Sequence, residues 1–420
     1  MKGFMMKGLF LVAIMLSTVG LCGSAFPDEA ALRIGTASAT INPEPGTYLA
    51  GYGHNRTCTG VHDDLFAKAV VFDDGETAVA LVVLDAISLQ YPTVQAIRRA
   101  AAEKTTALDL PPGHIAVQAT HTHCAPDTIG IYGPDPLHTG VDPTYMERLV
   151  ETAAEQVAEA ARRLQPASLR WAQTVCRGWA VNDSEPGELD NSVTILQCAD
   201  EDGKPRATLT NFACHPTVLG GDTTLASADW TGTFYQKMSA ALPGEHLFLQ
   251  GGVGGWVQPK TPERTFALAA RYGADLAEKT LAALEHTKPV DGARIRVARK
   301  EISLPIANDN FKQMAAAGLT ERGFDEGNVA TEVMWFAVGN AQFATHFGET
   351  APEYTQKTRE LMDTGSAFVL GLGLDHLGYI CPARFFERPE AIPFAAYQVS
   401  MSPGRDAGRI MMKALGDVIP

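Results

Sequence analysis

Two histidines separated by one residue close an apolar run in the segment VQATHTHCAPDT. Successive side chains of a β-strand point to opposite faces, so His121 and His123 would share a face if the strand continued through both. Two neighbouring imidazoles can supply one metal ligand and either a second ligand or a group that transfers a proton. The other interpretation of this pair is two histidines that are solvated or hydrogen-bonded.

Further metal-type residues follow apolar runs later in the chain. His215 stands in NFACHP, where Pro216 stops the strand, and Glu349 stands in FGET between a hairpin and a helix. Asp375 ends a strand in LGLGLDHLGY, and Tyr379 lies just beyond it. Each residue also has a structural interpretation: a histidine that caps backbone groups, a glutamate favoured by a helix dipole, or a buried tyrosine.

Three residues are candidates for orienting a metal ligand through a hydrogen bond without binding the metal themselves. Metal-bound imidazoles commonly donate to carboxylates, so the pair His62-Asp63 in GVHDD could serve this role, although it could equally stabilise a turn. Asp85 and Asp375 end apolar strands, where a buried charge without a partner is costly. We therefore expect His62, Asp85 and Asp375 to support the ligands.

The elements that must position these residues are strands alternating with helices, which indicates an α/β fold. Three stretches each predict a hairpin, a helix and a further strand, and each strand end carries metal-type residues. Ligand crevices form at strand ends in α/β folds, so these residues should converge. We expect layered mixed β-sheets flanked by helices in a single large catalytic domain, residues 26–420. The three predicted hairpin, helix and strand sets are 67–85, 94–108 and 114–120; 193–215, 230–242 and 246–252; and 333–349, 351–362 and 366–375.

Composition and the N-terminus restrict the partners. A formal net charge of -14 over 420 residues argues against binding to nucleic acid, so we expect a small-molecule ligand. Residues 1–25 contain two lysines, an apolar run from Leu9 to Leu21 and then small residues, as in an export signal peptide. A membrane anchor is the alternative, but the run is shorter than the roughly 20 residues that span a bilayer. The sequence therefore predicts an exported protein, periplasmic or extracellular, without a stable transmembrane anchor after signal removal.

Six ordered segments carry a family resemblance: GVHDDLFAKAVVFDDG, ATHTHCAPDTIGIYGP, NFACHPTVLG, SADWTG, FGET and LDHLGYICP. They resemble the catalytic domain of the neutral/alkaline non-lysosomal ceramidase family over residues 32–415. The resemblance implies one zinc ion held by His121, His215, Glu349 and Tyr379. It also implies that His123 helps to move a proton of the zinc-bound water and that Tyr397 helps to polarise the scissile carbonyl.

The resemblance implies amide hydrolysis of a small-molecule acylated substrate, which could be a lipid. Zinc lowers the pKa of bound water to about 7 and stabilises the oxyanion formed when hydroxide attacks a carbonyl. The leaving nitrogen must be protonated, which suits His123. We therefore expect an exported zinc-dependent amidohydrolase that cleaves a ceramide-type N-acyl amide of sphingolipid metabolism.

Departures from the family pattern keep other functions open. Ceramidases carry a Gly-Asp-Val-Ser-Pro stretch, whereas LQGGVGGWVQP lacks its aspartate and serine, and Asn182-Asp183-Ser184 has a carboxylate where ceramidases have an arginine. The C-terminal β-domain of the long ceramidases is also expected to be absent. The alternatives are an esterase, lactonase or amidase for a non-sphingolipid acylated compound, and a catalytically silent binding protein.

Overall fold

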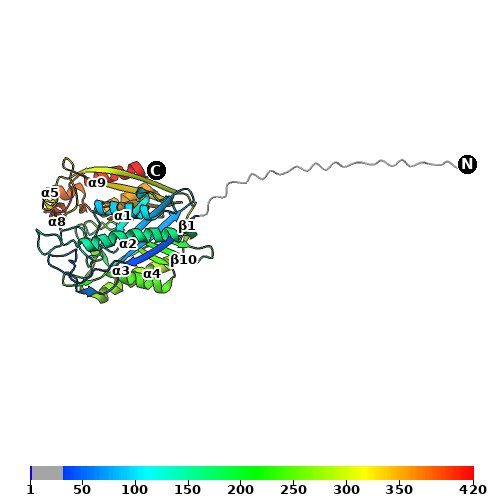
Figure 1. Ribbon diagram of the computed structural model, residues 1–420, viewed down its shortest axis with the longest axis horizontal. Coiled ribbons are helices and arrows are strands. Elements are labelled where there is room, and N and C mark those ends of the chain that lie inside the picture. The colour runs from blue at the N-terminus through cyan, green and yellow to red at the C-terminus, as the bar shows by residue number, and fades with distance from the viewer. Residues whose placement is uncertain (2–31) are drawn as a thin grey trace. The chain divides into compact units, whose positions relative to one another are not determined.

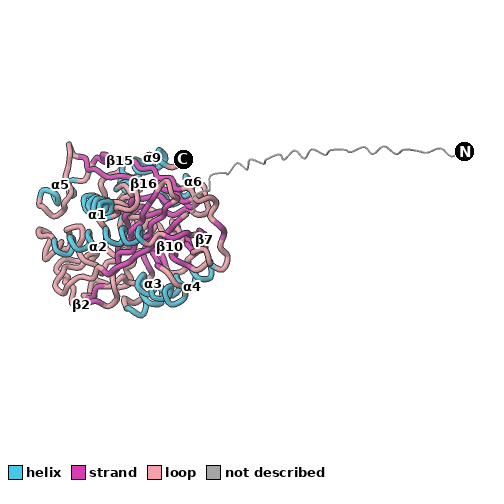
Figure 2. Tube along the Cα trace, turned by 45° about the vertical axis from the view of Figure 1, so that its right-hand side comes forward, coloured by secondary structure: helices cyan, strands magenta, loops and turns pink. Residues whose placement is uncertain are grey.

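The computed structural model describes residue 1 and residues 32–420. Residues 2–31, and with them the expected signal peptide, lie outside the described residues. Strands fill the interior of the folded part and helices lie at its periphery, as Figure 2 shows. Within residues 32–420, every helix is too short or too polar to span a bilayer.

The first sheet has five strands in the order β5-β4-β3-β1-β6; α2 packs on it and α1 lies against α2. Strand β4 (AVALVVL) is buried along its whole length, as a strand covered on both faces should be. Asp142 caps α2 by accepting hydrogen bonds from the backbone N–H groups of Thr144 and Tyr145. The elements are β1 (Arg33–Thr40), β3 (Phe66–Asp73), β4 (Ala78–Leu84), α1 (Tyr91–Lys104), β5 (Ile115–Ala119), α2 (Pro143–Arg162) and β6 (Gln165–Pro166).

The second sheet has the order β12-β10-β9-β7-β14, and helices α3 and α4 cover one of its faces. The two helices (green) lie together on one side of the strands, and α9 (red) lies on the opposite side (Figure 1). Asp229 caps α3, because its carboxylate accepts from the backbone N–H of Trp230. The elements are β7 (Ser168–Val175), β9 (Ser192–Ala199), β10 (Pro205–Phe212), α3 (Trp230–Ala241), β12 (Glu245–Gln250), α4 (Phe266–Leu284) and β14 (Lys288–Pro289).

The third sheet has four strands in the order β15-β16-β17-β19, with α9 on β15 and β16 and α6 on β19. Apolar side chains from all three sheets, such as Leu81, Leu209 and Phe343, form one buried cluster between them. The elements are β15 (Ile295–Pro305), β16 (Asn328–Val338), β17 (Ala341–Thr345), α6 (Pro352–Met362), β19 (Ala367–Leu370) and α9 (Ala407–Val418). The remaining helices and short strands are β2 (Gly60–Val61), η1 (Pro112–His114), β8 (Ala180–Asn182), β11 (Leu225–Ala226), β13 (Val257–Pro259), α5 (Asp309–Ala316), β18 (Glu349–Thr350), β20 (Tyr379–Ile380), α7 (Ala383–Glu387) and α8 (Ala395–Ser400).

Each sheet contains the same unit: an antiparallel hairpin, a helix, and a strand that pairs in parallel with the second strand of the hairpin. The units are β3-β4-α1-β5, β9-β10-α3-β12 and β16-β17-α6-β19. All three agree with the elements expected from the sequence. The prediction of mixed β-sheets flanked by helices is therefore confirmed.

Two buried glutamines tie together the strand ends of the three units. The side-chain amide of Gln118, in β5, donates to the carbonyls of Gln250 (2.7 Å) and Gly371 (2.8 Å), at the ends of β12 and β19. The amide of Gln250 donates in turn to the carbonyls of Thr120 and Cys214, both at 2.9 Å. The C-terminal ends of β5, β10, β12 and β19 therefore meet in one place, which is where ligand crevices of α/β folds form.

Candidate metal centre

His121 lies two residues beyond β5 in a strained backbone conformation. The strand ends at Ala119, and His121 has φ +73°, a value that bulky residues rarely adopt. The expectation that His121 and His123 lie on one face of a strand was therefore wrong, because the strand ends before both residues. The backbone N–H of His121 donates to the carbonyl of Ala86 at 2.9 Å, which holds the chain in this turn. Strain of this kind concentrates at functional sites.

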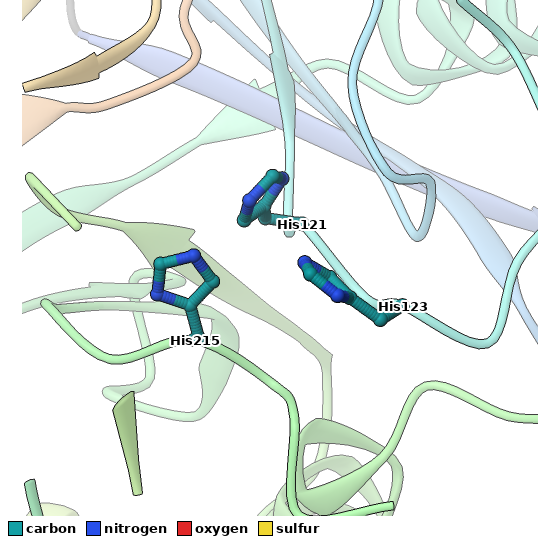
Figure 3. Close-up of side chains that lie close together, drawn as sticks. All are labelled: His121, His123 and His215. Carbon is teal, nitrogen blue, oxygen red and sulfur yellow. The ribbon is translucent and has the colours of Figure 1, made fainter. Parts of the chain in front are cut away.

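The rings of His121, His123 and His215 nevertheless converge, from two segments of the chain (Figure 3). Ring centroids lie 5.0 Å apart for His121 and His123, 4.8 Å for His121 and His215, and 5.7 Å for His123 and His215. One nitrogen from each ring lies within 4.8 Å of the others. His121 and His215 are buried, and His123 is partly buried. These three histidines form a site that could bind a metal ion.

Glu349 adds an oxygen to this site. Its Oε2 atom lies 3.1 Å from Nε2 of His215 and 3.6 Å from Nε2 of His121. Glu349 is in β18, before helix α6 begins at Pro352, so it is not a first-turn helix residue. Strand β18 pairs in parallel with β20, where Glu349 is opposite Tyr379. Side chains of paired residues project from the same face, so Glu349 and Tyr379 are neighbours.

The electrostatics of the cluster favour a cation. Burial would raise the pKa of Glu349, but His121 and His215 outweigh this and hold the pKa well below its usual value. Burial, with the charges of His121 and His215, holds the pKa of His123 well below its usual value. Nε2 of His121 and both ring nitrogens of His123 have no hydrogen-bond partner within residues 32–420. Imidazole nitrogens and a carboxylate are donors that zinc prefers, so these residues fit such an ion.

Backbone carbonyls, and not carboxylates, orient the two buried rings. Nδ1 of His121 lies 2.5 Å from the carbonyl oxygen of Ile87, and Nδ1 of His215 lies 2.7 Å from that of Val257. Each contact fixes the tautomer in which Nε2 is free to face the cluster. The expectation that Asp85 or Asp375 orients these rings was therefore wrong.

Both aspartates have other partners. Asp85 accepts from the backbone N–H of Phe66 at 3.0 Å and from the hydroxyl of Tyr235 at 3.2 Å. Asp375 forms a bidentate ion pair with Arg322 and accepts from the backbone N–H of Tyr91 at 2.9 Å. Asp85 directly follows the buried strand β4, as the sequence indicated, whereas Asp375 lies beyond the end of β19 at Leu370 and does not end a strand. Each carboxylate nevertheless has hydrogen-bond partners.

His62 also lies away from the rings. Its Nδ1 atom is 2.7 Å from Asp63, and its ring stacks on Phe266 with centroids 3.7 Å apart. Asp63 accepts from the hydroxyl of Ser227 at 2.6 Å and from the backbone N–H of Ala228 at 2.8 Å. The pair therefore stabilises a loop, which is the alternative that the sequence left open, and the expectation of a ligand-orienting His62 was wrong.

A cavity of about 330 Å³ opens from the cluster. The residues expected at the site all face it: His121, His123, His215, Glu349, Tyr379 and Tyr397. Tyr397 is 49% exposed, and its ring centroid lies 6.0 Å from that of Tyr379. Burial, followed by the charge of Glu349, raises the pKa of both phenols. The structure therefore brings together six chemically active residues that the sequence separates by up to 276 positions, from His121 to Tyr397.

Several aromatic and polar residues of the cavity were not predicted from the sequence. Tyr132 and Trp256 contribute aromatic walls, and His376 lies 6.3 Å from His121 between ring centroids. Nδ1 of His376 has no hydrogen-bond partner within residues 32–420, and burial lowers the pKa of this ring to about 4. The position of His376 between Asp375 and Tyr379 was the one signal available. Asp183 accepts a hydrogen bond from Gln258, which also lines the cavity, so this carboxylate lies just behind the wall.

Comparisons with known proteins agree with this geometry. A family model described as "Neutral/alkaline non-lysosomal ceramidase, N-terminal" matches residues 33–248, which is more than half of the chain. Neutral ceramidase A of Dictyostelium discoideum is 24% identical over 249 residues, which cover 53% of this chain and 34% of that protein. The chain thus spans about a third of the length of this relative.

Two solved structures share the fold. The neutral ceramidase from Pseudomonas aeruginosa superposes with a TM-score of 0.77 at 15% identity, covering 93% of this chain and 74% of that one. A structure titled "Ceramidase complexed with C2" also gives 0.77, at 14% identity and covering 93% and 75%. The shared fold agrees with the family match, which shows that the chain belongs to the neutral/alkaline non-lysosomal ceramidase family.

Proposed function

We propose that this protein is an exported zinc-dependent amidohydrolase that cleaves an N-acyl amide of the ceramide type. One observation carries the proposal: His121, His215 and Glu349 come together in the wall of one cavity, where Oε2 of Glu349 lies within 3.6 Å of Nε2 of both histidines and Nε2 of His121 has no hydrogen-bond partner within residues 32–420. Family membership supports hydrolysis of an amide bond. The family resemblance also supports zinc as the metal.

The proposed donors are Nε2 of His121, Nε2 of His215, a carboxylate oxygen of Glu349 and the phenol oxygen of Tyr379. A zinc ion there would supply a Lewis acid and activate a water molecule as a nucleophile at neutral pH. The contacts of Ile87 and Val257 with the two Nδ1 atoms support this choice, because a carbonyl can only accept, so each Nδ1 carries the ring proton and each Nε2 keeps a lone pair for a metal ion. The neighbouring positions of Glu349 and Tyr379 on paired strands support the two oxygen donors.

His123 and Tyr397 complete the proposed machinery. His123 has no hydrogen-bond partner within residues 32–420, and its lowered pKa keeps the ring neutral at neutral pH. A ring nitrogen of His123 therefore accepts the proton from the attacking water and delivers it to the amide nitrogen as this leaves. Tyr397 has a raised pKa, so its hydroxyl keeps a proton to donate to the substrate carbonyl.

A second candidate function is hydrolysis of a different acyl bond. Asp183 stands where ceramidases carry an arginine, and its contact with Gln258 brings a carboxylate close to the cavity. A carboxylate repels the anionic groups that a guanidinium would anchor. An ester or lactone of a non-sphingolipid compound is therefore the alternative substrate.

Metal content and turnover measured together test the proposal. Chelator-treated protein should bind one zinc ion per chain and should regain cleavage of a short-chain N-acyl sphingosine but not of the matched O-acyl ester. His121→Ala and His215→Ala should lose the zinc and the activity, whereas the exposed control His286→Ala should keep both. Ester cleavage alone would favour the second function. Zinc binding without turnover of any acyl compound would favour a silent binding protein, and failure to bind zinc would overturn the metal site.

A further inference from the structure

The loop after β12 holds a tryptophan at the wall of the proposed zinc site. Trp256 has φ +57°, in the left-handed region that bulky residues avoid, and it follows Gly255 with φ +78°. The residue lies in the LQGGVGGWVQP segment, which differs from the serine-containing stretch of ceramidases. A strained bulky residue persists only where its surroundings fix it, so the contacts of Trp256 indicate what it does.

Those contacts join Trp256 to Tyr379. The indole Nε1–H donates to the phenol oxygen of Tyr379 at 2.8 Å. The indole ring packs on Phe394, with centroids 4.3 Å apart, and on Tyr397 at 5.5 Å. Aromatic packing of this kind holds the ring in one orientation. The direction of the N–H group is therefore set independently of Tyr379.

The next residue makes a similar contact with another proposed ligand. The carbonyl oxygen of Val257 accepts from the backbone N–H of His215 at 3.0 Å and lies 2.7 Å from its Nδ1 atom. His215 and Tyr379 come from distant parts of the chain. One dipeptide, Trp256-Val257, thus contacts two of the four proposed donors, one through a side chain and one through the backbone.

An indole N–H can only donate, so the phenol oxygen of Tyr379 must accept in this contact. Its remaining lone pair is then available to a cation on the other side, and a donor at 2.8 Å also stabilises the negative charge of a metal-bound phenolate. We propose that Trp256 is a positioning residue that aims the phenol oxygen of Tyr379 at the zinc ion. The inference rests on the proposed function, because it takes Tyr379 as a ligand.

Zinc affinity of the whole chain, measured by competition with a chromophoric chelator, tests the inference without relying on turnover. Trp256→Phe keeps an aromatic ring but removes the donor, and we expect it to weaken zinc binding about 10- to 100-fold, the range for loss of a group behind a ligand. Trp179→Phe is the matched control. It removes an indole N–H that donates to Asp275 at 2.9 Å in the second sheet's core, and should leave zinc affinity unchanged.

A second replacement removes the same donor with no change of shape. Substitution of Trp256 by 3-benzothienylalanine exchanges N–H for sulfur in a ring of nearly equal size, and should weaken zinc binding as Trp256→Phe does. Wild-type affinity in either variant would overturn the inference. In a Tyr379→Phe background, Trp256→Phe should have no further effect, because its target oxygen is gone; an additive loss would also overturn the inference.

These outcomes separate the inference from the proposed function. If Tyr379→Phe weakens zinc binding and the two Trp256 replacements do not, the inference alone is wrong. If the wild-type protein binds no zinc, the proposed function fails at its metal site. If zinc binds equally well to wild type and to Tyr379→Phe, the assignment of Tyr379 fails and the role of Trp256 fails with it, while a site of His121, His215 and Glu349 remains.

Discussion

Gly51 packs against the ring of His123 so closely that a β-carbon at position 51 would lie 2.3 Å from Cγ of that ring. The backbone of Gly51 also has φ +97°, which favours glycine. Arg56 holds this arrangement in place, because its guanidinium donates to the carbonyls of both Ala50 and His123. The proposed proton-transfer ring is therefore confined between a glycine backbone and the proposed metal site.

Gly51→Ala should displace His123 and lower kcat while the protein still binds zinc. A displacement of about 1 Å of a reacting group costs on the order of 10²-fold in rate, so we expect a loss of this size. Gly53→Ala is the control, because a β-carbon at Gly53 meets no atom within 4 Å and its φ is not positive. Equal kcat values for the two variants, with both folded by circular dichroism, would contradict the predicted role of Gly51.

His123→Ala should keep the zinc ion and lose most of the activity. Loss of a general acid–base group lowers kcat by about 10²- to 10⁴-fold. The alternative is that His123 is a third imidazole ligand, because its ring lies within the same cluster as His121 and His215. Zinc titration separates the two roles. A fall in zinc affinity as large as that of His121→Ala would show that His123 is a ligand.

The strand ends of the site could be predicted from the sequence because apolar runs, turns and helix starts are local signals. The three hairpin, helix and strand units follow from these signals, and they place His121, His215 and Glu349 after buried strands. Pairing of the units in space does not follow from local signals. It depends on contacts such as those of Gln118 and Gln250, whose polar side chains give no sign in the sequence that they are buried.

The groups that orient the proposed ligands could not be predicted, for a different reason. The rings of His121 and His215 are oriented by the carbonyls of Ile87 and Val257, and every residue has a carbonyl, so side-chain type carries no information. The contact of Trp256 with Tyr379 could not be predicted either, because a tryptophan after two glycines gives no indication of its hydrogen-bond partner. Sequence reasoning favoured Asp85 and Asp375 because carboxylates commonly orient metal-bound imidazoles. In the structure, however, Asp85 accepts a hydrogen bond from Tyr235, and Asp375 forms an ion pair with Arg322.

Asp85 should make the stability of the protein depend on pH. Burial raises the pKa of this carboxyl from 3.8 to about 6. Between these values the native carboxyl keeps a proton that the unfolded chain has released, so the free energy of unfolding falls as the pH rises through this window. The difference of about two pKa units corresponds to about 3 kcal/mol.

Urea denaturation at pH 4, 5, 6 and 7 measures this effect. Asp85→Asn cannot ionise, so it should lose stability less steeply than wild type as the pH rises from 4 to 6. Asp200→Asn is the control, because Asp200 lies in the turn between β9 and β10 and accepts from the backbone N–H of Lys204 near the surface. Parallel stability curves for wild type and Asp85→Asn would contradict the raised pKa.

Arg322→Met should destabilise the protein strongly, because it leaves the carboxylate of Asp375 buried without its cation. The side chains of Arg322 and Asp375 are 6% and 0% exposed, and loss of one partner from such a pair costs about 3–5 kcal/mol. The exposed pair of Arg409 and Asp406 is the control, and Arg409→Met should cost less than about 1 kcal/mol.

The double variant Arg322→Met, Asp375→Asn shows whether the unpaired charge is the cause. An asparagine keeps the acceptor for the backbone N–H of Tyr91 but carries no charge, so the double variant should recover much of the stability lost by Arg322→Met. Urea denaturation of the four proteins in the cycle gives the coupling free energy between the two positions. If the double variant is less stable than Arg322→Met by the full effect of Asp375→Asn alone, the two side chains act independently and the ion pair does not stabilise the protein.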